Sequence, residues 1–396
     1  MNVETVYKGN AERLQVRVPV HDLTSEERFT QEREKIFRRS WLMIGREDEV
    51  PEVGSYVARE IPTMNTAFLM MRGQDNKVRV FHNMCTHRGN KLVADGSGCK
   101  RRINCGFHGW MFNPDGAIDV VTDEKQFRDL DKNLLGLRPI RSDAWEGNVF
   151  VNFDTAPKQT LAEWLHPVTE QYPGYFERHK PLNLRTVRIK SNWNLAINAF
   201  MEGYHTLYIH AHSVPDYQGG ASNPQRHRPY MEMMDRHIRY SAPSNPNHKW
   251  TPAEEIAWRY GKQLIPAFDN DMTDMPIGVN PGKAQNWAFD VVEFFPNTVI
   301  IFGNHWHVWL SFWPVDADNT LLYGSVFGIP AKNVGERLSQ EFALSRGRVV
   351  LREDLSTLEA QHAALKSGAL SHFQLSQQES SLQHHYRAAA DMLAQA

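Results

Sequence analysis

The chain of 396 residues is long enough for two domains, and its 41% hydrophobic and 23% charged residues are typical of a globular protein. A net charge of −2 gives no electrostatic reason to expect binding to nucleic acid or to an anionic membrane. Only three cysteines are present, which argues against a disulfide framework. No signal-peptide core or bilayer-spanning run is visible, so we expect a soluble, cytoplasmic protein.

The N-terminal part of the chain predicts an arm, a helix and a small β domain. Ser25, followed by two glutamates, predicts the start of a helix that continues to Phe37. Residues 41–80 alternate short apolar runs with turns, which is the pattern of short β-strands. Residues 147–153 predict a further strand that closes this domain near residue 158.

Two loops inside the predicted β domain carry a metal-binding pattern. Cys85 and His87 have the spacing C-x-H, and Cys105 and His108 have the spacing C-x-x-H. Two thiolates and two imidazoles suit either tetrahedral zinc or a two-iron, two-sulfur cluster in which two histidines bind one iron. Zinc fingers usually pair like ligands, whereas each loop here supplies one sulfur and one nitrogen. This distribution, together with the many glycines nearby, favours the iron–sulfur cluster.

The remaining residues predict a mixed sheet with helices around it. Strands are expected at residues 287–294, 298–302, 306–313 and 321–327, and long helices at about 333–366 and 375–394. Residues 214–250 are rich in proline, glycine, asparagine and histidine. They predict a long loop that is either a lid or channel wall or a merely mobile segment. We therefore expect an α+β fold for residues 159–396.

A second cluster of polar side chains lies near the middle of the chain. On a continuous helix, Asn198, Glu202 and His205 would share one face among apolar neighbours. Polar groups on such a face need partners, and a metal would supply one for His205. His212 would lie on the same face. His210 would be rotated by about 140°, so it could reach the same metal only if the helix were kinked or widened.

Both motifs resemble those of the Rieske non-haem iron oxygenases. The segment C-T-H-R-G-N…C-G-F-H-G-W is similar to the cluster loops of that family, and N-W-x-x-x-x-N-x-x-x-E-x-Y-H-x-x-x-x-H is similar to its catalytic-iron motif. The resemblance implies a [2Fe-2S] cluster in which Cys85 and Cys105 hold one iron and His87 and His108 hold the other. It identifies the chain as a terminal oxygenase (alpha) subunit of the ring-hydroxylating family.

The same resemblance implies the domain organisation. An all-β Rieske domain at residues 41–158 would be inserted near the start of a helix-grip-type α+β catalytic domain at residues 159–396. The N-terminal arm and helix, residues 1–40, would pack with the catalytic domain.

A mononuclear Fe(II) is also implied, held by two histidines and one carboxylate with positions open for O₂. The resemblance assigns His205 and His210 as the histidines, and Asp354 as the second residue of a late acidic pair. The reserve candidates are His212 for a histidine and Glu353 or Glu359 for the carboxylate.

Two further sets of side chains are assigned to the catalytic domain. In the family, the residue matching Glu202 bridges the two metal centres across a subunit boundary, although most members have aspartate there. Asn198 shares its face, and we group both as catalytic candidates. Candidate walls of the substrate pocket are Phe200, Met201, Tyr208, Phe302 and His305.

The chain shows no dinucleotide-binding motif after a strand and no second cysteine set, so electrons must come from elsewhere. The resemblance implies a separate NAD(P)H-dependent reductase, directly or through a ferredoxin, and a homotrimer with or without a small β subunit. We expect mono- or dioxygenation of a small, apolar, aromatic-type substrate, as in aromatic hydrocarbon catabolism. The alternatives are monooxygenation of a steroid, terpenoid or alkyl skeleton, N- or O-demethylation, a pure electron carrier, and a binding module with structural zinc.

Overall fold

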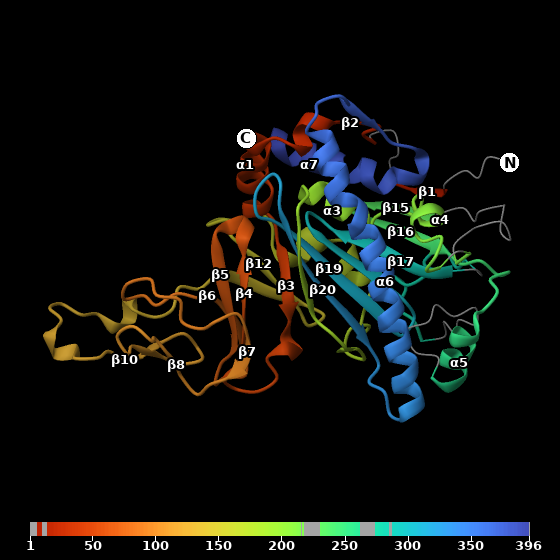
Figure 1. The fold of residues 1–396 in the computed structure, drawn as a ribbon. Helices are drawn as coiled ribbons and strands as arrows, with labels where there is room; N and C mark the ends of the chain where they lie inside the picture. Colours follow the sequence, from red (N-terminus) through yellow and green to blue (C-terminus); the bar gives the residue numbers. More distant parts are fainter. Residues whose placement is uncertain are drawn as a thin grey trace. The chain divides into compact units, whose positions relative to one another are not determined.

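The computed structural model describes residues 6–9, 14–214, 216–217, 230–261, 274–284 and 287–395. They form two compact units (Figure 1). One unit runs from Phe37 to Trp164, and the other combines the described residues up to Ile36 with those from Leu165 onwards. None of the described helices combines the length and the apolar character needed to cross a membrane.

The Phe37–Trp164 unit consists mainly of short antiparallel strands, as the alternating sequence predicted. Its largest sheet has the order β6 (Val78–His82), β5 (Thr66–Arg72), β4 (Ser55–Ile61), β7 (Gly96–Cys99). A second sheet joins β11 (Arg141–Trp145), β12 (Asn148–Asn152) and β3 (Leu42–Arg46). A third joins β10 (Ile118–Val120), β9 (Met111–Phe112) and β8 (Ile103–Asn104). The short helix α2 spans Leu161–Leu165.

An apolar core in this unit includes the two loop cysteines. Phe112 and Ile103 are fully buried, Trp110 is nearly so, and Cys85 and Cys105 belong to the same cluster. Apolar burial is the main stabilising contribution to such a small domain. The cysteine loops are therefore anchored by the same contacts that hold the strands together.

The second unit is organised around a nine-stranded sheet. Its order is β1 (Val6–Lys8), β15 (Tyr230–Met234), β16 (His237–Pro243), β17 (Trp287–Phe294), β18 (Thr298–Phe302), β19 (Trp306–Pro314), β20 (Thr320–Gly328), β13 (Lys180–Pro181). The ninth strand, β14 (Arg185–Ile189), also pairs with β20. A separate pair joins β2 (Arg17–Pro19) to β21 (His372–Gln374). The strands predicted from residues 287–327 are confirmed almost to the residue.

Helices cover the sheet and connect its edges. They are α1 (Glu26–Lys35), α3 (Trp193–Asn198), α4 (Thr206–Ile209), α5 (Pro252–Tyr260), α6 (Val334–Leu365) and α7 (Ser380–Ala394). α7 packs against β15 and β16, α3 against β19 and α6, and α6 against β14 and α5. Figure 1 shows the long helix α6 crossing the sheet. The predicted α+β architecture is confirmed.

The long loop predicted for residues 214–250 is wrong for residues 230–243, which form β15 and β16. The polar composition there was misleading, because its polar side chains are buried and paired. Arg239 is fully buried, and its guanidinium contacts the carboxylate of Glu232 and the hydroxyl of Tyr172. Buried charges are tolerated when they are paired in this way. Residues 215 and 218–229 lie outside the described residues.

Glu32 links α1 to the start of α3. Its side chain is buried, and it accepts hydrogen bonds from Trp193 Nε1 at 2.8 Å and from Arg28 Nε at 3.2 Å. Asn194 Nδ2 donates to the same carboxylate at 3.4 Å. Burial raises the pKa of Glu32, although these donors favour its charged form. The N-terminal helix thus fixes the segment that leads into the polar cluster of the second unit.

Replacing Glu32 by alanine is expected to destabilise the protein by roughly 2–3 kcal/mol, because the buried donors of Trp193 and Asn194 lose their acceptor. Urea unfolding followed by tryptophan fluorescence measures this change. Glu34→Gln, on the more exposed side of the same helix, is the matched control and should change stability by less than about 0.5 kcal/mol. Equal effects of the two substitutions would contradict the assigned role of Glu32.

Candidate functional site

The two cysteine–histidine loops share one backbone arrangement. In each loop the cysteine carbonyl accepts the N–H of a glycine, Gly89 to Cys85 at 2.9 Å and Gly109 to Cys105 at 3.0 Å. The glycines have φ values of +76° and +73°, a left-handed conformation that side chains disfavour. The loops are therefore two copies of the same tight turn, and each presents one cysteine and one histidine.

The four predicted cluster ligands meet in like pairs. The buried thiols of Cys85 and Cys105 are close enough to shift each other's pKa, and the rings of His87 and His108 lie 4.7 Å apart, centroid to centroid. Nδ1 of both histidines is buried and has no hydrogen-bond partner among the described residues. Buried polar atoms rarely lack a partner. Two thiols with two such nitrogens fit the ligand set of a two-iron, two-sulfur cluster.

The surroundings of the loops also fit a cluster. Burial opposes ionisation of Cys105, yet hydrogen bonds from the N–H groups of Phe107 and His108 lower its pKa overall. Such amide donors tune the sulfurs of iron–sulfur clusters. Trp110 is buried and stacks on the His87 ring at 4.7 Å with an angle of 11° between the planes. It forms an apolar wall against the His87 ring.

The predicted continuous helix through Asn198, Glu202 and His205 is wrong. α3 ends at Asn198, and a new helix, α4, starts at Thr206. Between them the Glu202 carboxylate accepts the backbone N–H groups of Tyr204 and His205. Side chains that bond nearby backbone amides compete with helix formation. The interruption also explains how His210 reaches His205, because His210 caps the C-terminal end of the short α4.

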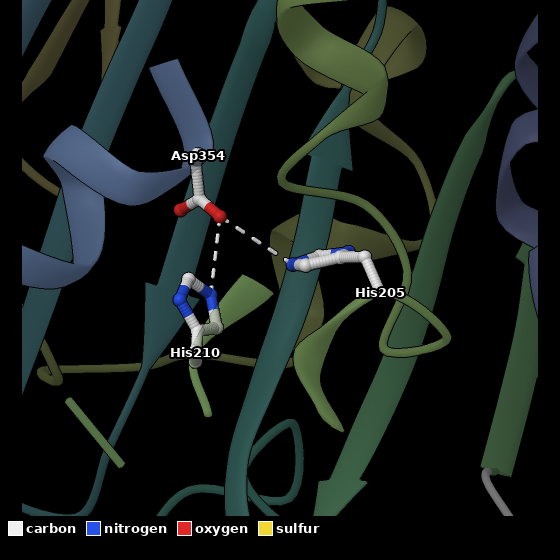
Figure 2. A group of neighbouring side chains, drawn as sticks. All are labelled: His205, His210 and Asp354. Atoms are coloured by element: carbon white, nitrogen blue, oxygen red, sulfur yellow. Dashed lines mark ion pairs between the residues drawn. The ribbon is translucent and has the colours of Figure 1, made fainter. Parts of the chain in front are cut away.

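His205, His210 and Asp354 come together in the second unit, with their ligand atoms within 4.8 Å of one another (Figure 2). Asp354 Oδ1 lies 3.1 Å from His210 Nε2 and 3.5 Å from His205 Nε2. The Asp354 side chain is buried, and Oδ1 accepts no well-directed hydrogen bond among the described residues. Burial raises the pKa of Asp354, although the two histidines oppose this effect.

Two further carboxylates lie behind the histidines. Glu202 Oε1 is 2.5 Å from His205 Nδ1, and Glu353 Oε2 is 2.9 Å from His210 Nδ1. Burial lowers the pKa of each histidine, but the neighbouring carboxylates outweigh burial and raise it. When Nδ1 donates to these carboxylates, each Nε2 presents a lone pair toward the Asp354 oxygen. Three lone pairs that converge repel one another unless a cation lies between them, so this group fits a two-histidine, one-carboxylate metal site.

Glu353 was assigned only as a reserve metal ligand in the sequence. The structure instead places it on His210 and Ser213, whose Oγ donates to it at 2.5 Å. Adjacent residues on a helix point about 100° apart, so Glu353 and Asp354 cannot both face the same atom. The signal available in the sequence was the adjacent acidic pair itself, because two neighbouring carboxylates on a helix must point in different directions.

The other reserve candidates lie elsewhere. His212 is exposed and is not part of the group, and Glu359 accepts the backbone N–H of Lys190 at 3.1 Å. Asn198 donates from Nδ2 to the hydroxyl of Tyr386 at 2.5 Å, and it does not line the cavity described next. The structure therefore does not bring Asn198 to the predicted site, because α3 ends there.

A cavity of about 290 Å³ adjoins the metal-binding group. Glu202, His205, His210 and Asp354 form part of its wall. The rest of the wall is mainly apolar and includes Phe200, Val291, Trp306, Leu310, Leu322 and Val350. Apolar pockets that contain a few converging polar groups are the usual form of small-molecule sites.

Of the five predicted pocket residues, only Phe200 lines this cavity. Met201 is buried in the core, and Tyr208 on α4 is 75% exposed. Phe302 on β18 stacks on Tyr172 with ring centroids 4.2 Å apart. Successive strand residues face opposite sides, and the preceding residue, Ile301, lines the cavity instead. His305 is exposed in the turn between β18 and β19. These four residues therefore do not line the cavity, because residue type alone does not indicate which face a side chain occupies.

Comparisons with protein families match the two parts of the chain separately. Residues 174–395 match the model described as "Ring hydroxylating alpha subunit (catalytic domain)". Residues 40–133 match the model described as "Rieske [2Fe-2S] domain".

The matches to curated relatives span about half of this chain and about half of each relative's own length. The carnitine monooxygenase oxygenase subunit of Escherichia coli (strain K12) is 29% identical over 193 residues, which are 48% of this chain and 50% of that protein. The large oxygenase component of the naphthalene 1,2-dioxygenase system of Pseudomonas aeruginosa is 31% identical over 198 residues, which are 48% of this chain and 43% of that protein.

Solved structures share the fold over nearly the whole chain. A quaternary ammonium Rieske monooxygenase has a TM-score of 0.76 at 21% identity, with 98% of this chain and 100% of the other covered. Naphthalene 1,2-dioxygenase from Rhodococcus sp. has a TM-score of 0.73 at 18% identity, with 96% of this chain and 95% of the other covered.

Gly109→Ala is expected to reduce cluster content, because alanine is strained at a φ of +73° and its Cβ would lie 3.0 Å from Thr122 Oγ1. Gly89→Ala has the same backbone strain, but its Cβ would approach nothing closer than Met84 Sδ at 3.9 Å. Acid-labile sulfide and visible absorbance per chain measure the outcome. A smaller loss for Gly109→Ala than for Gly89→Ala would refute this reasoning.

Glu353→Ala is expected to weaken Fe(II) binding at the mononuclear site by about 10–100-fold, because the His210 imidazole loses the carboxylate that orients it. Titration of the metal-free protein with Fe(II) against a competing chelator measures the affinity. Glu359→Ala, six residues further along α6, is the matched control and should leave the affinity unchanged. Unaltered binding in Glu353→Ala would remove Glu353 from the site.

Proposed function

Because this chain belongs to the ring-hydroxylating Rieske oxygenases, as an alpha subunit with a [2Fe-2S] cluster and a mononuclear iron, we propose that it is the terminal component of a multicomponent oxygenase. It receives electrons from a separate NAD(P)H-dependent reductase, directly or through a ferredoxin, and it oxidises a small substrate with O₂. The family is one of oxidoreductases, so neither a pure electron carrier nor a zinc-holding binding module fits this chain.

The observation that carries this proposal is the convergence of His205, His210 and Asp354 on one wall of an apolar cavity. When bound there, iron supplies O₂ activation, and the cluster supplies electrons one at a time. The protein's own contribution is positional. Glu202 and Glu353 hold the Nδ1 protons of the two histidines, so that both Nε2 atoms remain available as metal ligands.

We also propose that Glu202 connects the two metal centres in the assembled enzyme. One carboxylate oxygen contacts His205 Nδ1, while the other accepts the N–H groups of Tyr204 and His205 and so fixes the side chain. In a homotrimer, with or without a small β subunit, this carboxylate would meet a cluster histidine of a neighbouring subunit. The glutamate that stands where most members of the family have aspartate is long enough for this bridge.

The cavity supports hydroxylation of an apolar, aromatic-type substrate. Its wall beside the metal group is built from aliphatic and aromatic side chains. Such a wall excludes water from the reacting carbon and favours a hydrocarbon ring or skeleton. Its two acids, Glu202 and Asp354, are already engaged with histidines and offer no spare negative charge to a cation.

A second candidate is monooxygenation of a quaternary ammonium compound, which would belong to the demethylation-type alternative. Relatives named carnitine monooxygenase and choline monooxygenase favour it. The cavity wall also contains Phe200, Phe289 and Trp306, and aromatic faces attract quaternary ammonium groups. This candidate ranks second because, among the described residues of the wall, no carboxylate is free of a histidine partner and able to pair with a quaternary ammonium group.

Turnover with ¹⁸O₂ separates the two. The reduced holoenzyme, supplied with a reductase, is expected to incorporate one or two labelled atoms into naphthalene or biphenyl and to leave carnitine and choline unchanged. His205→Ala should abolish product formation because the iron loses a ligand, while the cluster absorbance and its reduction persist. Exclusive conversion of the methylated ammonium compounds would make the second candidate correct.

A further inference from the structure

Within the described part of the chain, one cation of the cavity wall has no acidic partner. Arg185 lies on β14 and lines the otherwise largely apolar cavity. Its guanidinium makes one hydrogen bond to the described residues, from Nη2 to the carbonyl oxygen of Leu344 at 3.5 Å. No carboxylate among the described residues forms an ion pair with it. Burial lowers the pKa of Arg185, and the charge of nearby Arg348 acts in the same direction.

The other arginine of the wall shows the contrast. Arg346 forms an ion pair with Glu254 at 2.6 Å, and its guanidinium lies over the rings of Tyr217 and Phe342. Its charge is therefore already balanced within the protein. A partly buried cation without such a partner is unfavourable, and an anion that enters the cavity would remove the penalty.

The strand pairing places Arg185 opposite a residue without a side chain. Its cross-strand partner on β20 is Gly324, and the space above Gly324 is taken by Leu310, whose Cδ2 would lie 3.0 Å from a Cβ built there. Asn183 and Ser325 lie next to this pair and also line the cavity. The cavity thus has a polar region at β14 and β20 that is chemically different from the hydrocarbon wall beside the metal group.

Helix α6 gives the separation between the two regions. Leu344, Gly347, Leu351 and Asp354 all line the cavity, and their spacing places them along one face of the helix. Arg185 bonds the carbonyl of Leu344, and Asp354 belongs to the metal group. Ten residues of α-helix correspond to about 15 Å along the axis. A substrate that touches both regions must be elongated.

We propose that Arg185 is a specificity-determining residue that binds the carboxylate of an elongated, largely apolar substrate and directs its opposite end toward His205, His210 and Asp354. This inference rests on the proposed oxygenase function and adds a substrate class to it. Arg185 does not contact the reacting carbon. It selects the substrate and determines which end of the molecule faces the metal group.

Biphenyl-4-carboxylate and biphenyl-4-carboxamide are the probes, because they share shape and length and differ in charge. Isothermal titration calorimetry on the holoenzyme is expected to show the carboxylate binding about 10–100-fold more tightly, the range for a hydrogen bond to a charged group. Arg185→Gln should remove this preference and leave carboxamide affinity within about twofold, a result that also verifies the folded cavity. Arg185→Lys should keep part of the preference. Arg188→Gln, at an exposed arginine of β14 that does not line the cavity, is the matched control.

Equal affinities of the wild-type protein for the two probes would overturn the inference, as would a preference that survives in Arg185→Gln. Product analysis under O₂ is a separate readout. Carboxylate binding that depends on Arg185 but gives no oxygenated product from any probe would support the anion site and contradict the oxygenase proposal. Oxygenation of both probes with equal KM would support the oxygenase and contradict the anion site.

Discussion

The hydrogen bonds between carboxylates and the Nδ1 atoms of two histidines are the constraint on which the catalytic unit depends. Glu202 and Glu353 come from different elements, one from the break between α3 and α4 and the other from α6. Each fixes both the ring orientation and the tautomer of its histidine. The Asp354 oxygen then faces two Nε2 atoms across a space that suits a cation. Without these outer carboxylates the rings could rotate and protonate at the wrong nitrogen.

In the two cysteine–histidine loops, the candidate ligands are held in position by backbone geometry and not by neighbouring acidic side chains. Each loop depends on a glycine in the left-handed conformation and on a cysteine embedded in the apolar core. Amide N–H groups that turn toward sulfur, together with a tryptophan stacked on His87, complete the environment. The two units therefore position their ligands by different means, one by turns and burial and the other by carboxylate–histidine pairs.

Local signals explain how much of this could be predicted. The candidate cluster ligands follow from their spacing, and the strands around residues 287–327 follow from their runs of apolar and aromatic residues, because both signals depend on residues close in sequence. Asp354 lies far from the histidines along the chain, so only family resemblance suggested it. The helix break after Asn198 was missed because the side chain of Glu202 competes with the helix in a way that periodicity does not reveal. Phe302 was assigned to the wrong face because the register of β18 is set by its neighbours.

Helix α6 has a double role that bears on substrate range. This helix supplies Asp354 to the metal group and, nearer its N-terminus, Gly347 to the cavity wall. A Cβ built at Gly347 would meet no atom within 4 Å, and a glycine in mid-helix costs about 1 kcal/mol relative to alanine. Larger side chains at this position would shorten the space available to a bound molecule and also favour the helix. A substitution at Gly347, two turns before the candidate metal ligand Asp354, would thus change the length of molecule that fits the cavity without changing the residues of the metal group.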